Sequence, residues 1–282
     1  MRASTKPTPG EAACTGGDTT AAERHLRLIT YNIQVGIQTE KYQHYVTRGW
    51  QHVLPNNTRD ENLNRIAEAL KDFDVAALQE TDGGSYRSRF VNQVEYLADQ
   101  AEFPYWYQQR NRNLGKLGQH GNGLLTRIKP EILEDHKLPG IMPGRGAIIA
   151  RFALEHSSLL IVVAHLSLGA RAQNQQLDYL RELVADADHA VVMGDLNSHL
   201  TSLLSHSPLK DSGLRGPELP QNSFPSWKPM RSLDHILVSS ELEIGSLGTL
   251  DLPFSDHLPV AMDIILPEPL QSKRVTDSPE PE

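Results

Sequence analysis

Four polar side chains stand where apolar, strand-like segments of the chain end. They are Asn32, Glu80, His165 and Asp195. A polar residue at a single strand end is common, so each position alone carries little information. If the strands pack together, however, their ends meet at one rim, although the segments are far apart in the sequence. The sequence therefore predicts that these side chains form one site.

The segment GDLNS combines a carboxylate and an amide that can activate water. Two-residue alternation directs Asp195 and Asn197 to the same side, and Gly194 allows a substrate or another backbone to approach closely. The carboxylate can accept a proton while the amide holds an oxygen in line for attack. The alternative is an ordinary turn, for which Gly, Asp, Asn and Ser are typical residues.

A second pair of motifs offers an imidazole and its partner. In SDHLPV, Asp256 and His257 are adjacent before a strand, so their side chains should diverge toward a metal and a phosphate oxygen. Asp234, which alternates with Ile236 and Val238 in a predicted strand, is the candidate that fixes the tautomer of His257 and keeps it protonated. The alternative is a purely structural Asp–His pair.

Glu80 offers the hard oxygen ligand that Mg²⁺ or Mn²⁺ prefers. A solvated glutamate at a strand end is the alternative. The 12 histidines include no HExxH motif, and a single cysteine, Cys14, cannot make a thiolate site, so magnesium is favoured over zinc. The chain also lacks a GxSxG serine motif and a nucleotide phosphate loop, and the glycines of GKLGQHGNGLLTR are expected to form a flexible loop.

Substrate choice is expected to depend on two regions. One is a polar, aromatic-containing insertion at about 38–57, with Tyr42, His44, Tyr45, Trp50 and His52; the other comprises Asn122 and Arg145. The guanidinium of Arg145 can bind a phosphate through two nitrogens. Alternatively, Arg145 is a solvated loop residue and the aromatic side chains pack the insertion onto the domain.

Hydrophobic periodicity predicts more strands than helices. Asp60 or Asn62 can cap a helix that continues to Leu70, and two further helices are expected around 90–97 and 177–184. Strands are expected at 26–32, 75–78, 105–107, 124–126, 148–154, 159–164, 191–193, 233–238 and 258–265, with a hairpin turn at 156–158. This mixture of hairpins and crossovers favours a two-sheet α/β sandwich over a doubly wound parallel fold.

Length and composition indicate one catalytic domain at 24–267 between disordered tails at 1–23 and 268–282, in a chain of 282 residues with 39% hydrophobic residues. The lone cysteine and the lack of a signal-peptide or membrane-length apolar run predict a cytoplasmic protein without a transmembrane segment, and we expect a monomer. The net charge of −8 disfavours tight binding to duplex DNA without excluding a nuclease.

Seven motifs occur in an order that resembles the endonuclease/exonuclease/phosphatase superfamily, which includes deoxyribonuclease I, abasic-site endonucleases, inositol polyphosphate phosphatases and neutral sphingomyelinases. They are TYNIQ, LQET, GNGLLTR, AHLSLG, GDLNS, SLDHILVS and SDHLPV, and they span 26 to about 265. The resemblance implies a four-layered α/β sandwich with two packed mixed β-sheets flanked by helices. The site would lie at one rim of the sheets.

The resemblance also implies roles for individual residues. Glu80 would be the primary metal ligand, with Asn32 and Asp256 nearby; Asp195 would orient or deprotonate water; Asn197 would contact phosphate; His257 with Asp234 would bind the scissile phosphate; and His165 would be the general acid. Gln34 occupies a position where some members carry a second metal-binding Asp, so one tightly held cation is expected. The sequence provides no evident carboxylate partner for His165.

These observations predict a hydrolase of phosphate esters that uses Mg²⁺ or Mn²⁺ and a metal-assisted water, acting as a phosphodiesterase. Its substrate would be a nucleic acid, a phospholipid headgroup or a sugar phosphate. One alternative is a phosphomonoesterase or a lipid-headgroup phosphodiesterase, which the acidic charge favours. Another is a catalytically silent binding module, against which the complete set of acid, amide and imidazole positions argues.

Overall fold

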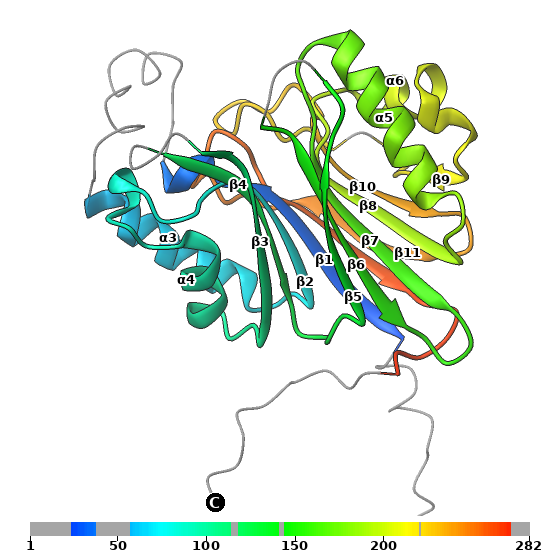
Figure 1. Ribbon diagram of the computed structural model, residues 1–282, viewed down its shortest axis with the longest axis horizontal. Coiled ribbons are helices and arrows are strands. Elements are labelled where there is room, and N and C mark those ends of the chain that lie inside the picture. The colour runs from blue at the N-terminus through cyan, green and yellow to red at the C-terminus, as the bar shows by residue number, and fades with distance from the viewer. Residues whose placement is uncertain (1–23, 38–56, 114–117, 141–143, 220, 272–282) are drawn as a thin grey trace, which may run out of the picture.

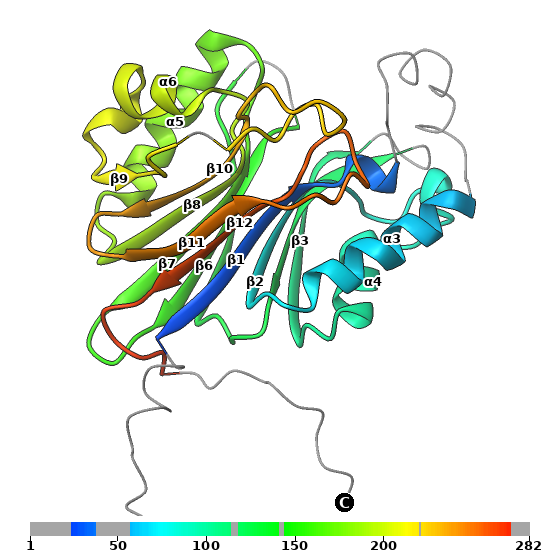
Figure 2. The same cartoon turned by 180° about the vertical axis from the view of Figure 1, so that it is seen from behind.

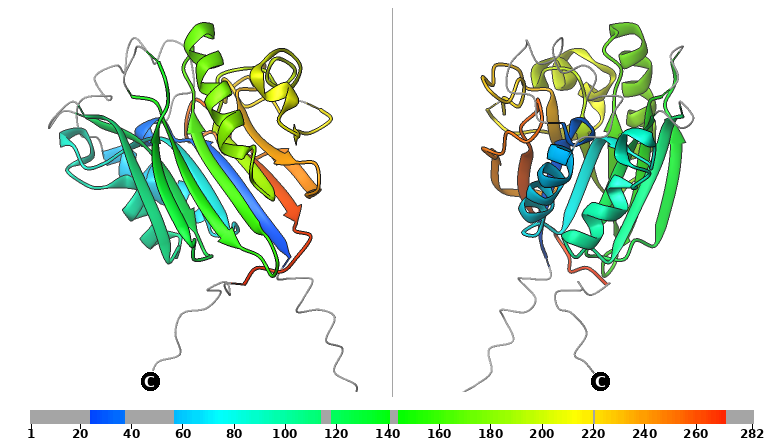
Figure 3. Two further views of the ribbon diagram at one scale, coloured as in Figure 1. Left: turned by 45° about the vertical axis from the view of Figure 1, so that its right-hand side comes forward. Right: turned by 90° about the vertical axis from the view of Figure 1, so that its left-hand side faces the viewer.

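Two β-sheets packed face to face, with helices on both outer surfaces, make up the fold (Figures 1 and 2). A computed structural model describes residues 24–37, 57–113, 118–140, 144–219 and 221–271. Each sheet has six strands, and the order of layers from one side to the other is helix, sheet, sheet, helix (Figure 3). The predicted four-layered α/β sandwich is confirmed.

The first sheet has the strand order β11-β12-β1-β2-β4-β3. Strands β1 and β2 run parallel, and the other neighbours are antiparallel, so the sheet is mixed. Its strands are β1 (His25–Asn32), β2 (Val75–Asp82), β3 (Tyr105–Asn113), β4 (Gln119–Thr126), β11 (Glu243–Thr249) and β12 (Val260–Ile265).

The second sheet has the order β5-β6-β7-β8-β10-β9 and is also mixed, because β7 and β8 are parallel. Its strands are β5 (Ile132–Lys137), β6 (Gly146–Ala153), β7 (Ser158–His165), β8 (His189–Asp195), β9 (Leu214–Arg215) and β10 (Asp234–Ser239). The predicted hairpin between β6 and β7 is present, with Ala153 paired to Ser158.

Helices cover the outer face of each sheet. Helices α3 (Asn57–Leu70) and α4 (Gln93–Gln100) pack their apolar side chains on the first sheet, and α5 (Ala170–Val184) and α6 (Leu200–His206) pack on the second. Short 3-10 turns lie at Gln34–Gly36, Tyr86–Ser88 and Pro208–Asp211. Among the described helices, none has the length and apolar character needed to cross a lipid bilayer.

The core between the sheets determines which side chains reach the rim. Alternate residues of the central strands face this core, among them Leu26 and Leu28 of β1, Ile161 and Val163 of β7, Val191 and Met193 of β8, and Ile236 and Val238 of β10. The same alternation places Asn32, His165, Asp195 and Asp234 on the core-facing side where these strands reach the rim. The site therefore lies directly above the inter-sheet core.

Several predicted boundaries differ from the structure. Helix α3 begins at Asn57, so Asp60 and Asn62 lie within it and do not cap it. Helix α4 begins after Asn92, whose side chain accepts hydrogen bonds from the backbone of Val94 and Glu95, and Phe90 is outside the helix. At α4, capping of the exposed amides determines the start more than apolar spacing does.

The glycine-rich segment was expected to be a loop, but its second half is part of β4. Gly121 and Gly123 pair with both neighbouring strands, where side chains would collide with Gln109 and Val94. Glycine is therefore required here because strand β3 and helix α4 both approach β4 closely. The chain also continues in the folded body beyond the expected boundary at 267, since Leu270 forms a bridge with Leu154.

Candidate active site

Side chains from both sheets meet at one rim of the sandwich, as expected from the polar residues at the ends of the predicted strands. His165 of β7 pairs in register with Asp195 of β8, and Asp195 pairs with Asp234 of β10. Asn32 lies at the end of β1 in the other sheet. Its Nδ2 donates a hydrogen bond across to Asp195 Oδ2 at 3.0 Å. The packing of the two sheets thus assembles the site.

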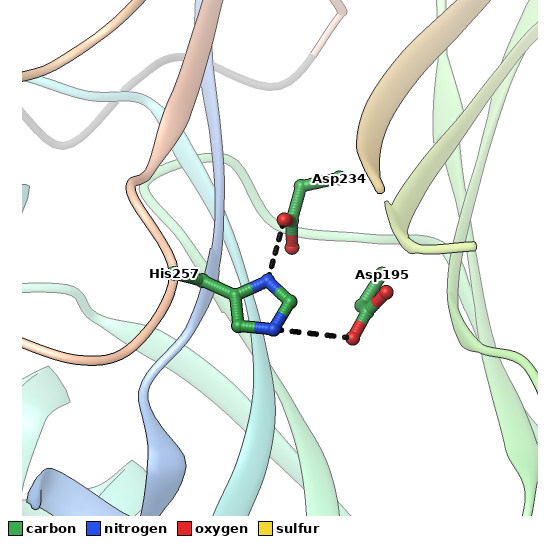
Figure 4. A group of neighbouring side chains, drawn as sticks. All are labelled: Asp195, Asp234 and His257. Atoms are coloured by element: carbon green, nitrogen blue, oxygen red, sulfur yellow. Dashed lines mark hydrogen bonds and ion pairs between the residues drawn. The ribbon is translucent and has the colours of Figure 1, made fainter. Parts of the chain in front are cut away.

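The expected pair of His257 and Asp234 is present (Figure 4). His257 Nδ1 lies 2.6 Å from Asp234 Oδ2, which also accepts a 2.5 Å hydrogen bond from the hydroxyl of Ser223. Burial acts to lower the pKa of His257, but the charges of Asp234 and Asp195 outweigh it and raise that pKa well above the usual value. His257 is therefore a cation at neutral pH.

Asp195 lies between two imidazoles. Its Oδ2 is 3.4 Å from Nε2 of His165 and 4.0 Å from Nε2 of His257. Asp195 is therefore the carboxylate partner of His165 that was not evident from the sequence. Burial and the nearby charge of Asp234 raise the pKa of Asp195 to about 7. A carboxyl group with such a pKa can exchange protons near neutral pH.

Burial lowers the pKa of His165 well below the usual value, and the positive charge of Arg145 adds to this effect. The two imidazoles on either side of Asp195 therefore differ in charge. His165 is neutral at neutral pH, and His257 is positively charged.

Backbone conformation positions the GDLNS segment. Gly194 has a φ of +144°, and a Cβ atom there would collide with the carbonyl oxygen of Ala164, so the expected close approach is made by the backbone of β7. Asn197 has a φ of +50°. Its backbone N–H donates to Asp195 Oδ1 at 3.1 Å, and its Nδ2 donates to the carbonyl of Leu166 at 2.9 Å. Asn197 thus orients Asp195.

Glu80 stands on an irregularity of β2, where pairing with β4 shifts between Leu78 and Thr81. Its φ of +55° is costly for a residue with a side chain, and such conformations concentrate at functional sites. Burial raises the pKa of Glu80, and the neighbouring charge of Asp256 raises it further. A carboxylate whose ionised form is disfavoured by a neighbouring negative charge suits a divalent cation.

Asn32 turns its amide nitrogen toward Glu80. Nδ2 lies 3.3 Å from Glu80 Oε1, and Oδ1 accepts the backbone N–H of Gln34 at 3.2 Å. A second group of possible ligand atoms belongs to Asp195, Asp234 and His257, all within 4.8 Å of one another. In that group, however, His257 Nδ1 is already used by its hydrogen bond to Asp234.

A cleft of about 290 Å³ opens beside these residues, and its lining includes Glu80, His120, Asn122, Arg145, His165 and Ser167. Burial lowers the pKa of the Arg145 guanidinium, while the charges of Glu80 and Asp195 oppose that shift. Asn122 Nδ2 donates to Gln109 Oε1 and to the carbonyl of Gly146, both at 3.1 Å. Asn122 therefore supports the backbone next to Arg145.

Sequence reasoning missed Ser223, Ser167 and the buried glutamines Gln173 and Gln176 of α5, which hold neighbouring parts of the site. The spacing of the glutamines, three residues apart on the face that also carries Leu177 and Leu180, was an available signal. The insertion residues Tyr42, His44, Tyr45, Trp50 and His52 lie outside the described residues.

Comparisons with known proteins place the chain in a family. Residues 29–257 match the model of the Endonuclease/Exonuclease/phosphatase family. No curated protein matched the chain. Among solved structures, an endonuclease/exonuclease/phosphatase from Beutenbergia cavernae has 19% identity and a TM-score of 0.65, with 86% of this chain and 72% of that chain covered.

Two further solved structures share the fold. A mannosyl-6-phosphatase from Bacteroides thetaiotaomicron has 18% identity and a TM-score of 0.60, with 86% of this chain and all (100%) of that chain covered. D. rerio TDP2, complexed with a single strand DNA product, has 16% identity and a TM-score of 0.61, with coverage of 85% and 98%. The family match spans most of the folded body, and the chain belongs to the endonuclease/exonuclease/phosphatase family.

Proposed function

We propose that this chain is a hydrolase of phosphate esters that depends on Mg²⁺ or Mn²⁺ and acts on phosphodiesters. The observation that carries the proposal is the position of Asp195 Oδ2, between His165 and His257 and 3.0 Å from Asn32 Nδ2. A buried carboxylate with a pKa near 7, next to His165 in the lining of a cleft that also contains Arg145, is suited to accept a proton from an attacking water.

His257 and Arg145 supply positive charge for the phosphate. The Asp234 carboxylate keeps His257 protonated and fixes its orientation, so His257 can donate from Nε2 to a phosphate oxygen as negative charge develops. Arg145, which lines the cleft, can bind another phosphate oxygen. The second hydrogen of Asn197 Nδ2 has no acceptor in the described parts of the chain, and we assign it to the phosphate as well.

His165 receives a different role from the one expected. Because burial lowers its pKa, His165 is neutral in the free protein and is a poor general acid at neutral pH. We assign it to hydrogen bonding with Asp195 and substrate. The protonated His257 is the better candidate to donate a proton to the leaving oxygen.

Glu80 and Asp256 would hold the metal ion. Both are carboxylates at the rim, and the raised pKa of Glu80 reflects negative charge that a cation would neutralise. When bound, the cation would neutralise charge on phosphate oxygens. Asn32, proposed from the sequence as a further ligand, presents nitrogen to Glu80, so we assign it to orienting Glu80 and Asp195.

A panel of substrates tests the proposal. Bis(p-nitrophenyl) phosphate, p-nitrophenyl phosphate, an oligonucleotide, sphingomyelin and a sugar phosphate would be incubated with and without Mg²⁺ or Mn²⁺. We expect metal-dependent release of product from diesters above all, with Asp195→Ala inactive. Faster turnover of monoesters would favour the phosphomonoesterase alternative, and no turnover of any phosphate ester would favour a binding module.

A further inference from the structure

Ser167 lies in the cleft wall with all its backbone hydrogen-bonding groups engaged inside the protein. It follows β7 by two residues, is 6% exposed and shares the cleft with Arg145 and His165. Its backbone N–H donates to Gln176 Oε1 at 2.8 Å, and its carbonyl accepts from Gln173 Nε2 at 3.2 Å. Its hydroxyl is the remaining polar group.

The neighbouring amide of Gln176 determines the direction of the hydroxyl. A backbone N–H can only donate, so the atom of Gln176 that faces Ser167 N must be Oε1. Nε2 then lies 3.0 Å from the carbonyl of Pro139 and 3.0 Å from Ser167 Oγ. An amide nitrogen cannot accept a hydrogen bond, so Ser167 Oγ is the acceptor and its hydrogen must point elsewhere.

That hydrogen has no acceptor among the residues that the structure describes. Ser167 lines the cleft, and a buried hydroxyl normally finds a partner because leaving its hydrogen unpaired is costly. We propose that Ser167 donates this hydrogen to a phosphoryl oxygen of the substrate, beside the guanidinium of Arg145. The proposal rests on the phosphate-ester hydrolysis proposed above and adds a substrate contact to it.

The glutamines of α5 are positioning residues in this arrangement. Gln173 Nε2 lies 3.0 Å from the carbonyls of Leu196 and Asn197, in addition to its contact with Ser167. It therefore ties the loop after β7 to the loop after β8, which carries Asn197. Gln176, fully buried, determines which atom of Ser167 faces the substrate.

Hydrolysis of bis(p-nitrophenyl) phosphate by Ser167→Ala tests the contact. A hydrogen bond to a charged group contributes about 1.5–3 kcal/mol, so we expect kcat/KM to fall roughly 10- to 100-fold. Ser167→Thr keeps the hydroxyl and should recover most of the loss. The matched control is Ser207→Ala: Ser207 is also buried, but its hydroxyl donates to the carbonyl of Leu203 and does not line the cleft.

Gln176→Glu tests the direction of the hydroxyl separately. A carboxylate oxygen in place of Nε2 would accept the hydrogen of Ser167 Oγ, so this variant should lose as much kcat/KM as Ser167→Ala while Ser167 remains present. If Gln176→Glu does not fold, Ser167→Ala decides alone. A loss in Ser167→Ala no larger than that in Ser207→Ala would overturn the proposal, as would full activity of a folded Gln176→Glu.

Binding of inorganic phosphate separates this proposal from the proposed function. If the wild-type protein hydrolyses no phosphate ester, the proposed function fails, and Ser167 is then tested by calorimetric titration with phosphate. We expect Ser167→Ala to bind phosphate several-fold more weakly than Ser207→Ala. Equal affinities would overturn the contact.

Discussion

Replacing Asp195 by asparagine should stabilise the fold while it abolishes activity. Asp195 is buried beside Asp234 and Glu80, and its pKa rises from 3.8 to about 7. Its ionised form is therefore less favourable in the folded protein than in the unfolded chain. The cost is absent below pH 3.8, grows as pH rises toward 7 and is complete above that value. Asparagine has a similar shape and carries no charge. Its amide nitrogen, however, would replace one of the two oxygens that accept hydrogen bonds from Asn32 and Asn197, a loss of about 1–3 kcal/mol that does not depend on pH.

The size of the effect follows from the pKa shift. Each unit corresponds to about 1.4 kcal/mol, so the shift of Asp195 corresponds to at most about 4 kcal/mol above pH 7. We expect the gain in free energy of unfolding of Asp195→Asn over the wild type to be about 2–3 kcal/mol larger at pH 8.5 than at pH 5, with a net stabilisation at pH 8.5.

Urea unfolding followed by circular dichroism, in EDTA so that no metal binds, measures this difference. Asp251→Asn, at an exposed position, is the matched control and should change the free energy of unfolding by less than about 0.5 kcal/mol. An Asp195→Asn protein that is less stable than the wild type at pH 8.5, or equally affected at both pH values, would refute the electrostatic reasoning.

Three further changes test other parts of the site. Asp234→Asn should lower the pKa of His257, so the alkaline limb of the pH profile of kcat/KM should move to lower pH; an unmoved limb would show that His257 does not depend on Asp234. Glu80→Gln should weaken activation by Mg²⁺, measured as a higher cation concentration for half-maximal activity, and an unchanged titration would remove Glu80 from the ligand set. Gly194→Ala should lower the free energy of unfolding by more than about 3 kcal/mol because its Cβ would collide with Ala164, whereas Gly213→Ala, in open space at a φ of +74°, should cost only about 1 kcal/mol.

The sequence predicted the central strands and the residues at their ends because both depend on local patterns. Alternation of apolar side chains identifies the strands that face the inter-sheet core. The same alternation predicts that Asp234 lies on the same face of its strand as Ile236 and Val238. Strands β5 and β11 were not predicted, because they lie at sheet edges with exposed or half-buried side chains and carry little apolar alternation. Helix α6 has only seven residues, too few for a clear helical period.

Contacts between distant segments could not be predicted in the same way. The proximity of His165 and Asp195 follows from the parallel register of β7 and β8, and no feature of either motif encodes that register. The hydroxyl direction of Ser167 depends on Gln176, which lies on a helix packed outside the sheet. Burial and neighbouring charges, which exist only after folding, give His165 and His257 opposite shifts in pKa.

The most direct test of a metal-dependent hydrolytic site centred on Asp195 is hydrolysis of bis(p-nitrophenyl) phosphate by metal-stripped protein as Mg²⁺ or Mn²⁺ is added. We expect no turnover before the cation is present, equal activation of the wild type and Asp251→Ala, and a loss of at least about 10²-fold in a folded Asp195→Ala protein. Turnover without a cation, or near-normal turnover by Asp195→Ala, would contradict the proposed site.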